Sequence, residues 1–324
     1  MQERILNEKL PDAAPPGGRG REIEMFEIRI GTILPAENAV EMMPALAPLQ
    51  FEGYELTCGA YFRTADIGEY AARVAEAAEG LPISSLGCYG NTLADGGVRS
   101  DIERLIDNAW RFDCGIVSVF AGALPGVSVP DSIPAFKKTF SELCARAEDH
   151  GVSLAIEGCP MGTNWRVGGG QNIAFCPDAW AMVFDAVPDD CLGLEWEPCH
   201  ALMQLMDPVA QLRKWAPKVK HVHGKDGTVA WDVIRAHGIA CGQPYGWNRT
   251  PGFGDTNWND ICTILLMNGY TGFIDIEGYH DPVHYDTGEW SAQLRAVNYL
   301  KDCRGGREYV DCPVYRGYQP PKGR

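Results

Sequence analysis

Residues 192–200 have the sequence LGLEWEPCH. The stretch begins as a short apolar run, carries Glu195 and Glu197 two positions apart, and passes through Pro198 into a new segment. A short apolar run of this kind is typical of a buried parallel strand, which a helix usually follows. A carboxylate at the end of a buried strand is costly unless something compensates its charge. The stretch therefore predicts a strand that delivers an acidic group to one edge of a buried sheet.

Similar strand-like runs and helical patterns alternate along the chain. The strand candidates are Glu27–Ile33, Gly53–Thr57, Ile83–Tyr89, Gly115–Phe120, Ser153–Glu157, Leu192–Glu197, Val219–His223 and Gly272–Glu277. The helical patterns are Asn38–Pro48, Tyr70–Ala78, Ser100–Trp110, Ile133–His150, Pro177–Val187, Val209–Trp215, Asn259–Asn268 and Ser291–Leu300. This series predicts a (β/α)₈ TIM barrel of the α/β class, since such barrels need about 250 residues. An open sheet remains an alternative, but no G-x-G-x-x-G follows the first strand, so a dinucleotide-binding fold has little support.

The two ends of the chain differ from its middle. Residues 1–26 are polar and contain the run Pro15–Gly18, and residues 304–324 end in a similar Pro- and Gly-containing segment. Such composition is typical of arms and tails rather than of packed domains. We therefore expect an N-terminal arm (1–26), one barrel domain (27–303) and a C-terminal tail (304–324). The barrel core does not need the tails, so we expect them to contact another subunit in a homo-oligomer.

Composition limits the possible partners and compartments. The 324 residues carry a formal net charge of −15, which disfavours nucleic acid as a partner because phosphates require a basic face. The twelve cysteines are scattered without a C-x-x-C pair, which favours reduced, mostly buried thiols. No apolar stretch approaches the roughly 18 residues of a membrane span, and the N-terminus lacks the order of a secretion signal. We expect a cytoplasmic protein that does not contact membranes.

The last four strand candidates end in potential metal ligands, namely Glu157, Glu197, His223 and Glu277. In a TIM barrel the active site lies at the C-terminal ends of the strands, so these side chains should meet. Three carboxylates and one imidazole suit Mn²⁺, Mg²⁺, Co²⁺ or Zn²⁺, and the predominance of oxygen favours Mn²⁺ or Mg²⁺. The alternative is four separate, solvated strand ends, each paired with a lysine or a helix N-terminus. We predict one catalytic divalent ion, with Mn²⁺ the first choice.

Strand alternation distinguishes neighbouring candidates. Glu195 and Glu197 share one face of their strand, and His221 and His223 share one face of theirs. The more C-terminal member of each pair lies nearer the mouth of the barrel. Glu197 and His223 are therefore the expected ligands, with Glu195 and His221 behind them.

Two further residues have the chemistry to assist at this site. His200 follows Glu197 by three positions, where its imidazole could approach a sugar hydroxyl or only cap a helix. Lys225 follows His223 closely and could stabilise an enediolate oxygen or bind an anionic group. The alternative for Lys225 is an ion pair with the adjacent Asp226.

Two long segments are candidates for substrate loops. The segment Gly242–Trp258 contains Trp247 and Arg249 and precedes the eighth strand, where barrel enzymes keep substrate loops. Arg249 could anchor an anion or hydroxyl, whereas Trp247 and Trp258 could stack on a sugar ring or pack the loop. The segment Met161–Pro177 carries Trp165 and a triple glycine, which suggests a cover over the mouth with Trp165 facing the substrate.

The order of these motifs resembles one superfamily. IEGCP at 156–160, EPCH at 197–200, HVHGKD at 221–226 and IE at 276–277 resemble the xylose-isomerase-like barrels. More narrowly, residues 27–303 look like the sugar phosphate isomerase/epimerase group, which includes ketose 3-epimerases and the inosose and hydroxypyruvate enzymes.

That resemblance assigns roles to particular residues. It implies that Glu157, Glu197, His223 and Glu277 bind the metal, and that Glu157 and Glu277 also take and return the substrate proton. It implies that His200 contacts substrate oxygens. Members more often have Asp where this chain has Glu197, so the longer side chain changes the reach of that ligand.

These expectations lead to a metal-dependent sugar isomerase or epimerase that abstracts a proton beside a carbonyl through an enediolate. The alternative is a lyase, deglycosidase or decarboxylase that acts on a keto sugar with the same site. From another class, an apurinic-site endonuclease would need more metal ligands and a basic groove, and the first half of the chain offers only His150. A non-catalytic sugar-binding barrel is the remaining alternative.

Overall fold

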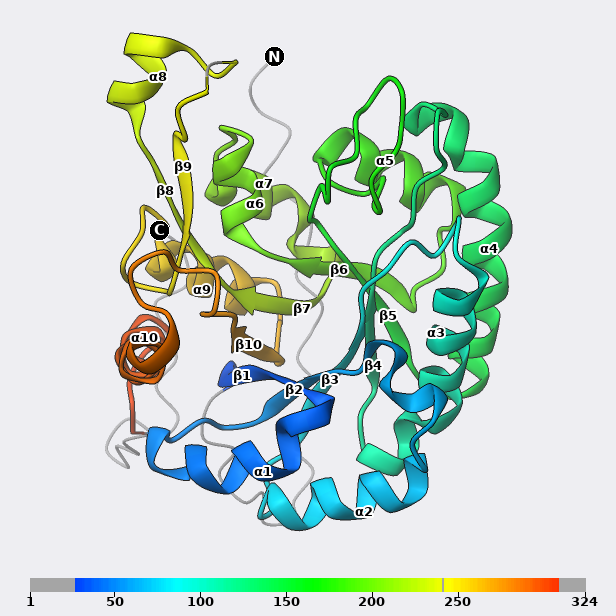
Figure 1. Ribbon diagram of the computed structural model, residues 1–324, viewed down its shortest axis with the longest axis vertical. Coiled ribbons are helices and arrows are strands. Elements are labelled where there is room, and N and C mark those ends of the chain that lie inside the picture. Colours follow the sequence, from blue (N-terminus) through cyan, green and yellow to red (C-terminus); the bar gives the residue numbers. More distant parts are fainter. Residues whose placement is uncertain (1–26, 241, 309–324) are drawn as a thin grey trace, which may run out of the picture.

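A computed structural model of the chain describes residues 27–240 and 242–308. Its principal strands are β1 (Arg29–Pro35), β2 (Tyr54–Thr57), β3 (Ile83–Cys88), β4 (Ile116–Val119), β5 (Ser153–Glu157), β6 (Leu192–Trp196), β7 (Val219–Gly224) and β10 (Phe273–Ile276). These strands pair in parallel and close into a barrel in the order β1–β10–β7–β6–β5–β4–β3–β2 (Figure 1). The prediction of a TIM barrel is confirmed. Residues 1–26 and 309–324, which make up the predicted arm and most of the predicted tail, lie outside the described residues.

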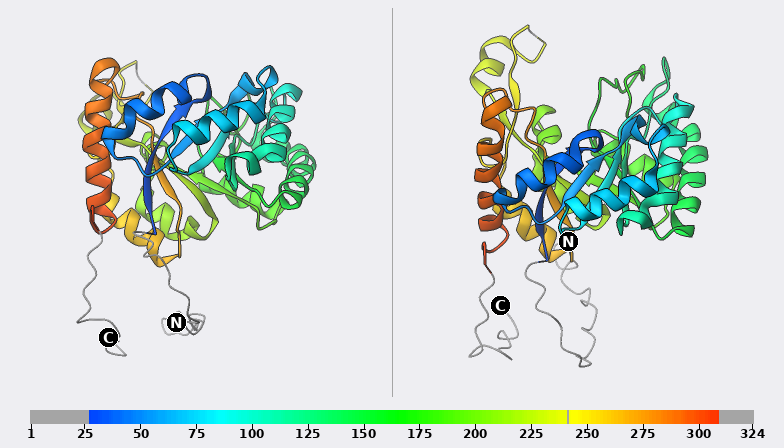
Figure 2. Two further views of the ribbon diagram at one scale, coloured as in Figure 1. Left: turned by 90° about the horizontal axis from the view of Figure 1, so that it is seen from below. Right: turned by 60° about the horizontal axis from the view of Figure 1, so that its bottom comes forward.

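Helices surround the barrel, as Figures 1 and 2 show. They are α1 (Ala36–Leu46), α2 (Ile67–Ala77), α3 (Gly96–Asn108), α4 (Val129–Asp149), α5 (Pro177–Ala186), α7 (Pro208–Trp215), α9 (Trp258–Met267) and α10 (Glu289–Cys303). Short 3₁₀ turns lie at Ala47–Leu49, Gly59–Arg63, Ala109–Phe112, Ala216–Lys218 and Asp286–Gly288. Several helices begin at a side chain that accepts a backbone N–H of the first turn, namely Asp66, Asp95, Ser128, Asp207 and Asn257. Such caps satisfy donors that the helix itself leaves unpaired.

The two faces of the barrel strands differ in chemistry. One face carries apolar side chains that belong to the hydrophobic core, such as Leu56, Leu86, Val117, Leu154 and Val222. The alternate positions carry fully buried polar side chains, namely Glu55, Ser85, Ser118, Glu195, His221 and Asp275. Branched apolar residues usually fill the interior of a TIM barrel. Here a column of polar side chains replaces part of that apolar filling, so ionisable groups lie beneath the C-terminal mouth of the barrel.

Two insertions extend the regular barrel. The strands β8 (Asp226–Val229) and β9 (Gly246–Arg249) form an antiparallel hairpin, with α8 (Trp231–His237) between them. This arm projects beyond the barrel in Figure 1. A short helix, α6 (Pro198–Met203), begins directly after Glu197. The sequence did not predict these elements, because the two strands, DGTV and GWNR, are not apolar runs and α6 spans less than two turns.

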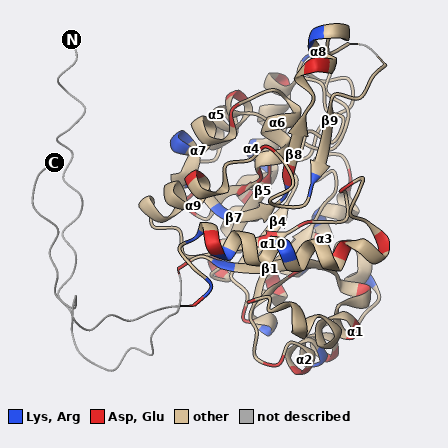
Figure 3. Cartoon of the chain, turned by 90° about the vertical axis from the view of Figure 1, so that its left-hand side faces the viewer, with Lys and Arg blue, Asp and Glu red and all other residues tan. Residues whose placement is uncertain are grey.

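The described residues can be compared with the expectations for cysteines, charge and membrane-spanning segments. Their cysteines are free thiols, as expected from their scattered positions. Acidic and basic residues are interspersed along the helices in the view of Figure 3. Within the described ranges, the structure contains no helix with the length and apolarity that a membrane crossing requires.

An ion pair joins the end of α10 to the start of the barrel. Arg304 donates from Nη2 to Glu52 Oε1 at 2.8 Å and from Nη1 to the Ile28 carbonyl at 2.7 Å. Glu52 also accepts the backbone N–H of Ile30 at 2.8 Å. Burial alone would raise the pKa of Glu52, but Arg304 and the Ile30 N–H together lower it below the ordinary 4.5.

We expect Glu52→Gln to destabilise the fold by about 1 to 3 kcal/mol at neutral pH, because hydrogen bonds to charged groups contribute about that much. The stabilisation by Glu52 is present above the ordinary carboxyl pKa and is lost as the pH falls through its lowered folded value. The difference between wild type and variant should therefore shrink in acid. Urea unfolding at several pH values measures it, with the exposed Glu142→Gln as control. An unchanged unfolding free energy in Glu52→Gln at neutral pH would contradict this account.

Candidate metal centre

The four predicted ligands meet at the C-terminal mouth of the barrel. Glu157 ends β5, Glu197 lies between β6 and α6, His223 lies in β7, and Glu277 follows β10. All four side chains are buried. His223 Nδ1 lies 3.7 Å from Glu197 Oε2 and 3.5 Å from Glu277 Oε2. Ligand atoms of Glu157, Glu197 and His223 lie within 4.8 Å of one another, as the atoms around one ion must.

Two atoms of this cluster are buried without a hydrogen-bond partner, Glu197 Oε2 and His223 Nδ1. The other carboxylate oxygen of Glu197 accepts the Cys199 thiol at 2.5 Å. Buried polar atoms without partners are costly, so native structures rarely leave them unsatisfied. A divalent cation that accepts electron pairs from oxygen and nitrogen would satisfy both atoms. The residues present therefore fit a metal ion.

His200, in the first turn of α6, lies between two of the carboxylates. Its Nε2 is 3.1 Å from Glu157 Oε1 and 3.1 Å from Glu197 Oε2. Burial opposes a charged imidazole here, but contact with Cys199 and Glu197 raises the pKa of His200 well above its ordinary value. The short helix α6, which the sequence did not predict, thus places His200 within the predicted site.

Lys225 supplies a buried positive charge to the same cluster. Its Nζ donates to Glu277 Oε1 at 2.7 Å and lies 3.6 Å from Glu197 Oε1. The alternative of an ion pair with Asp226 is wrong. Asp226 instead accepts the backbone N–H groups of Gly227, Gly252, Gly254 and Thr256, which fold the loop at the base of the arm.

A further histidine, which the sequence analysis did not identify, lies at this cluster in addition to His200 and His223. His280 Nδ1 lies 3.0 Å from Glu277 Oε1, and its side chain is 45% exposed. His280 follows Glu277 by three positions, the same spacing that separates His200 from Glu197. That repeated spacing was the signal that could have identified it. An exposed imidazole at the mouth can contact a substrate as well as Glu277.

The carboxylates Glu157 and Glu277 therefore have different environments. Burial raises the pKa of Glu157, and its contact with His200 opposes that rise. Although burial also acts on Glu277, the ammonium group of Lys225 holds the pKa of Glu277 well below its ordinary value. The two carboxylates are chemically unequal, as acid and base partners often are.

A second layer of ionisable groups lies beneath the mouth. His223 Nε2 is 3.1 Å from Glu55 Oε2 and 3.0 Å from Glu195 Oε1. His221 Nε2 is 2.9 Å from Glu55 Oε2 and 3.0 Å from Asp275 Oδ2. Burial raises the pKa of Glu195 to about 7. Burial opposes a charge on His221, but Asp275 and Glu55 raise the pKa of His221 to about 10.

Part of this layer was predicted. Glu195 and His221 lie behind the candidate ligands, as strand alternation indicated. Glu55 and Asp275 were missed, although each is an acid inside an apolar strand, which was the available signal. Tyr89 was also missed; its hydroxyl lies 2.6 Å from Glu55 Oε1 and 2.9 Å from Glu195 Oε2.

Comparison with known sequences identifies the architecture. The sequence profile described as "Xylose isomerase-like TIM barrel" matches residues 43–303. The chain belongs to the xylose isomerase-like TIM barrel family. Curated relatives include inosose dehydratases from Clostridium tetani (28% identical over 114 residues) and Clostridium beijerinckii (31% over 111 residues). These matches cover 34% and 33% of this chain and 37% and 36% of those proteins, so the chain spans well under half of their length.

Solved structures of similar proteins agree on the fold. A xylose isomerase-like TIM barrel protein from Mycobacterium smegmatis in complex with magnesium superposes with a TM-score of 0.65 at 20% identity, over 85% of this chain and 96% of that one. The 3-keto-D-glucoside 4-epimerase from E. coli superposes with a TM-score of 0.62 at 16% identity, over 85% and 100%. An L-ribulose 3-epimerase gives 0.63 at 17%, over 86% and 96%.

The other predicted substrate residues of this xylose isomerase-like barrel contact residues outside the metal cluster. Arg249 Nε donates to Asp281 at 3.1 Å. Trp165 packs edge-on against Phe175, and Trp247 is half-buried in β9. Trp258 is fully buried in the core, where it packs rather than stacks on a ligand. The structure thus groups His200 and Lys225 with the four ligands, whereas Arg249 contacts Asp281 and Trp165 contacts Phe175, which lie outside that group.

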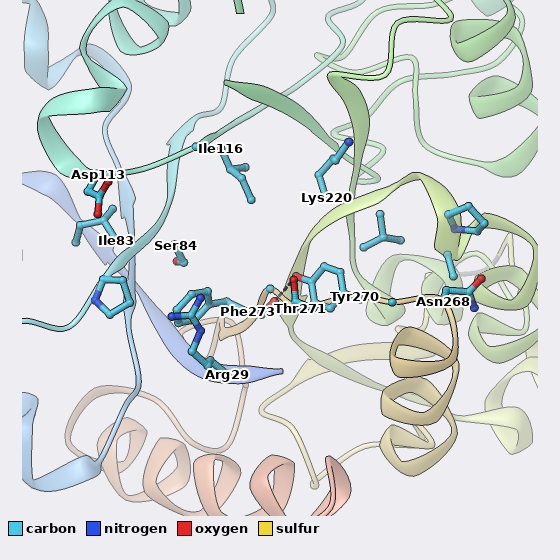
Figure 4. A pocket seen from close by; sticks show the side chains of 17 residues that line it. Arg29, Ile83, Ser84, Asp113, Ile116, Lys220, Asn268, Tyr270, Thr271 and Phe273 are labelled. Carbon is cyan, nitrogen blue, oxygen red and sulfur yellow. Dashed lines mark hydrogen bonds between the residues drawn. The ribbon is translucent and has the colours of Figure 1, made fainter. Parts of the chain in front are cut away.

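The opposite end of the barrel carries a pocket of about 550 Å³. Arg29, Ser84, Lys220 and Phe273 contribute to its wall, as Figure 4 shows. Ser84 donates a hydrogen bond to Asp275, so the buried polar column extends from the cluster to this pocket. In TIM barrels the active site lies at the C-terminal face of the strands. The cluster at that face, rather than this pocket, is therefore the candidate active site.

Proposed function

We propose that this chain is a divalent-metal-dependent enzyme that removes a proton beside the carbonyl of a sugar or sugar derivative, and that it works as an isomerase or epimerase. The observation that carries this proposal is the convergence of Glu157, Glu197, His223 and Glu277 with unpartnered atoms on Glu197 and His223. These four residues would hold the ion. The oxygen-rich set favours Mn²⁺, with Mg²⁺, Co²⁺ and Zn²⁺ as other fits.

A bound divalent ion withdraws charge from a carbonyl and its neighbouring hydroxyl, which makes the adjacent C–H more acidic. Glu157 and Glu277 stand on β5 and after β10, which β6 and β7 separate in the barrel, so they approach the site from different sides. One carboxylate accepts the α-proton to give an enediolate, and the other returns a proton. Lys225 and His200 stabilise the developing negative charge on the substrate oxygens.

The position to which the proton returns decides the product. Return to the opposite face of the same carbon gives an epimer. Return to the neighbouring carbon gives an aldose–ketose isomer. Structural neighbours include a 3-keto-D-glucoside 4-epimerase, an L-ribulose 3-epimerase and a D-psicose 3-epimerase, which supports a carbohydrate as substrate here.

A second candidate is a lyase on a keto sugar, such as a dehydratase. The unequal contacts of the two carboxylates favour it, because Glu277 faces Lys225 and His280 whereas Glu157 faces His200. In an elimination, one carboxylate removes the α-proton, the β C–O bond breaks, and a separate acid protonates the departing hydroxyl as water. The curated relatives named inosose dehydratase support this candidate.

Incubation of the Mn²⁺-loaded protein in D₂O with ketoses, an inosose and a 3-keto-glucoside tests both candidates. The epimerase proposal predicts deuterium at the carbon beside the carbonyl together with an epimer or isomer, detected by NMR. Deuterium exchange without epimer or isomer would reject it. Loss of water, seen as an enone absorbance and a mass lower by one water, would establish the second candidate. Absence of exchange and of elimination with every compound would contradict the proposed chemistry.

We also propose that the protein is a cytoplasmic homo-oligomer. The free thiols of the described residues support a reducing compartment. Light scattering coupled to size exclusion, on the full chain and on a chain that ends at Glu308 and so keeps Arg304, tests the predicted role of the C-terminal tail. A monomeric full chain, or an unchanged oligomeric state after truncation, would contradict it.

A further inference from the structure

The imidazole of His223 contacts acidic side chains through both of its nitrogens. Nδ1 faces Glu197 and Glu277 at 3.7 and 3.5 Å and makes no hydrogen bond. Nε2 faces the buried layer, where it lies 3.1 Å from Glu55 Oε2. A neutral imidazole carries one N–H, and its hydrogen-bond partner decides which nitrogen holds it. The contacts place the proton of His223 on Nε2 and leave the electron pair of Nδ1 toward the candidate ion.

Glu55 has the better hydrogen-bond geometry of the two acids near Nε2. Glu195 Oε1 is 3.0 Å away but has no hydrogen bond, so it lies off the N–H direction. Glu55 Oε2 accepts the N–H, and Glu55 Oε1 accepts the Tyr89 hydroxyl at 2.6 Å. Both oxygens of a fully buried carboxylate are thereby fixed in place. Glu55 stands on β2 and reaches His223 on β7 across the interior of the barrel.

We propose that Glu55 is a positioning residue that orients His223 and thereby sets the affinity of the site for its divalent ion. This inference rests on the proposed metal site. Metal-bound histidines usually donate their second N–H to a carboxylate, which fixes the ring and strengthens the ligand, and loss of such a partner lowers metal affinity about 10- to 100-fold. Glu55 is the carboxylate that makes this contact here, although the sequence places it far from the ligand motifs.

The buried layer also provides a matched control. Asp275 is as deeply buried as Glu55 and belongs to the same network. Its carboxylate contacts His221 Nε2 at 3.0 Å and accepts a hydrogen bond from Ser84. A substitution at Asp275 therefore disturbs the same column without removing the acceptor of His223. A general packing defect would affect both positions alike, whereas a positioning role belongs to Glu55.

The test is a titration of the metal-free full-length protein with Mn²⁺, in which binding is measured by calorimetry or by the EPR signal of free Mn²⁺. Glu55→Leu removes the acceptor and is expected to raise the Mn²⁺ Kd about 10- to 100-fold. Glu55→Gln retains one acceptor oxygen, so its Kd should lie between those of Glu55→Leu and wild type. Asp275→Asn should remain within about threefold of wild type. Circular dichroism and urea unfolding verify that each variant is folded, and Glu55→Gln carries the test if Glu55→Leu does not fold.

Three results would overturn the inference. The first is a wild-type Kd in folded Glu55→Gln and Glu55→Leu, and the second is an equal loss in Asp275→Asn. The third is a stoichiometry of two ions in wild type that falls to one in Glu55→Gln, because Glu55, Glu195, His221 and His223 also lie close enough to share an ion. His223→Ala tests the proposed metal site separately from the role of Glu55. An unchanged Mn²⁺ Kd in His223→Ala would contradict the metal site itself. A raised Kd in His223→Ala together with a wild-type Kd in the Glu55 variants would contradict only the positioning role.

Discussion

Glu157→Gln and Glu277→Gln are each expected to lower the rate of solvent deuterium exchange into the substrate by about 10²- to 10⁴-fold, the usual contribution of a general acid or base. An amide cannot accept the α-proton at neutral pH, although its oxygen can still contact a cation. The rate is measured by NMR at saturating Mn²⁺, with bound metal quantified in the same samples. This separates loss of the proton-transfer group from loss of the ion.

The relative size of the two effects distinguishes the candidate reactions. An epimerase that uses both carboxylates should lose product formation in both variants, whereas an elimination with a single base should lose α-proton exchange in only one of them. Glu52→Gln is the control, because Glu52 is a partly buried carboxylate that pairs with Arg304 at the other end of the barrel. Wild-type exchange rates in both Glu157→Gln and Glu277→Gln would contradict the assigned proton-transfer roles.

Glu197→Ala is expected to remove the bound ion, with a metal affinity at least about 100-fold below that of wild type. The substitution removes a buried carboxylate whose Oε2 accepts no hydrogen bond, and it also removes a contact of Lys225. Lys225 keeps its hydrogen bond to Glu277 but loses one of its two carboxylate contacts in a buried site, so some loss of stability should accompany the loss of metal. Metal content after gel filtration and the Mn²⁺ Kd measure the effect.

Glu197→Asp is the informative partner of that variant. Aspartate keeps a carboxylate at this position with a shorter reach, so Glu197→Asp should bind the ion more tightly than Glu197→Ala does. The backbone at Glu197 is extended and leads directly into α6. Equal metal binding by wild type and Glu197→Ala would remove Glu197 from the ligand set.

The barrel could be predicted from sequence because each strand is a continuous apolar run with a helix after it. The four candidate ligands could be predicted because each follows or ends such a run. Glu55 could not be linked to them, since it lies on β2 and the barrel closes through contacts between β1 and β10 that are distant in sequence. Asp275 could have been linked to Glu277 by the strand alternation that placed Glu195 behind Glu197, because it also lies two positions before a candidate ligand.

Adjacent opposite charges offered an alternative to the predicted role of Lys225. Lys225 and Asp226 are adjacent and opposite in charge, so an ion pair was a reasonable alternative. Lys225, however, lies between β7 and β8, and its side chain contacts Glu277, whereas Asp226 begins β8 and organises the loop that contains Gly252 and Thr256. The hairpin β8–β9 escaped prediction because its short strands lack a clear alternation of apolar residues.

The central claim is that Glu157, Glu197, His223 and Glu277 bind one divalent ion at the mouth of the barrel. Anomalous diffraction from crystals of the Mn²⁺-loaded protein tests it most directly. The account predicts one anomalous peak per chain, within coordination distance of His223 Nδ1 and of oxygens from the three carboxylates. A peak on the Nε2 side of His223, among Glu55, Glu195 and His221, or a protein that gives no peak at saturating Mn²⁺, would contradict it.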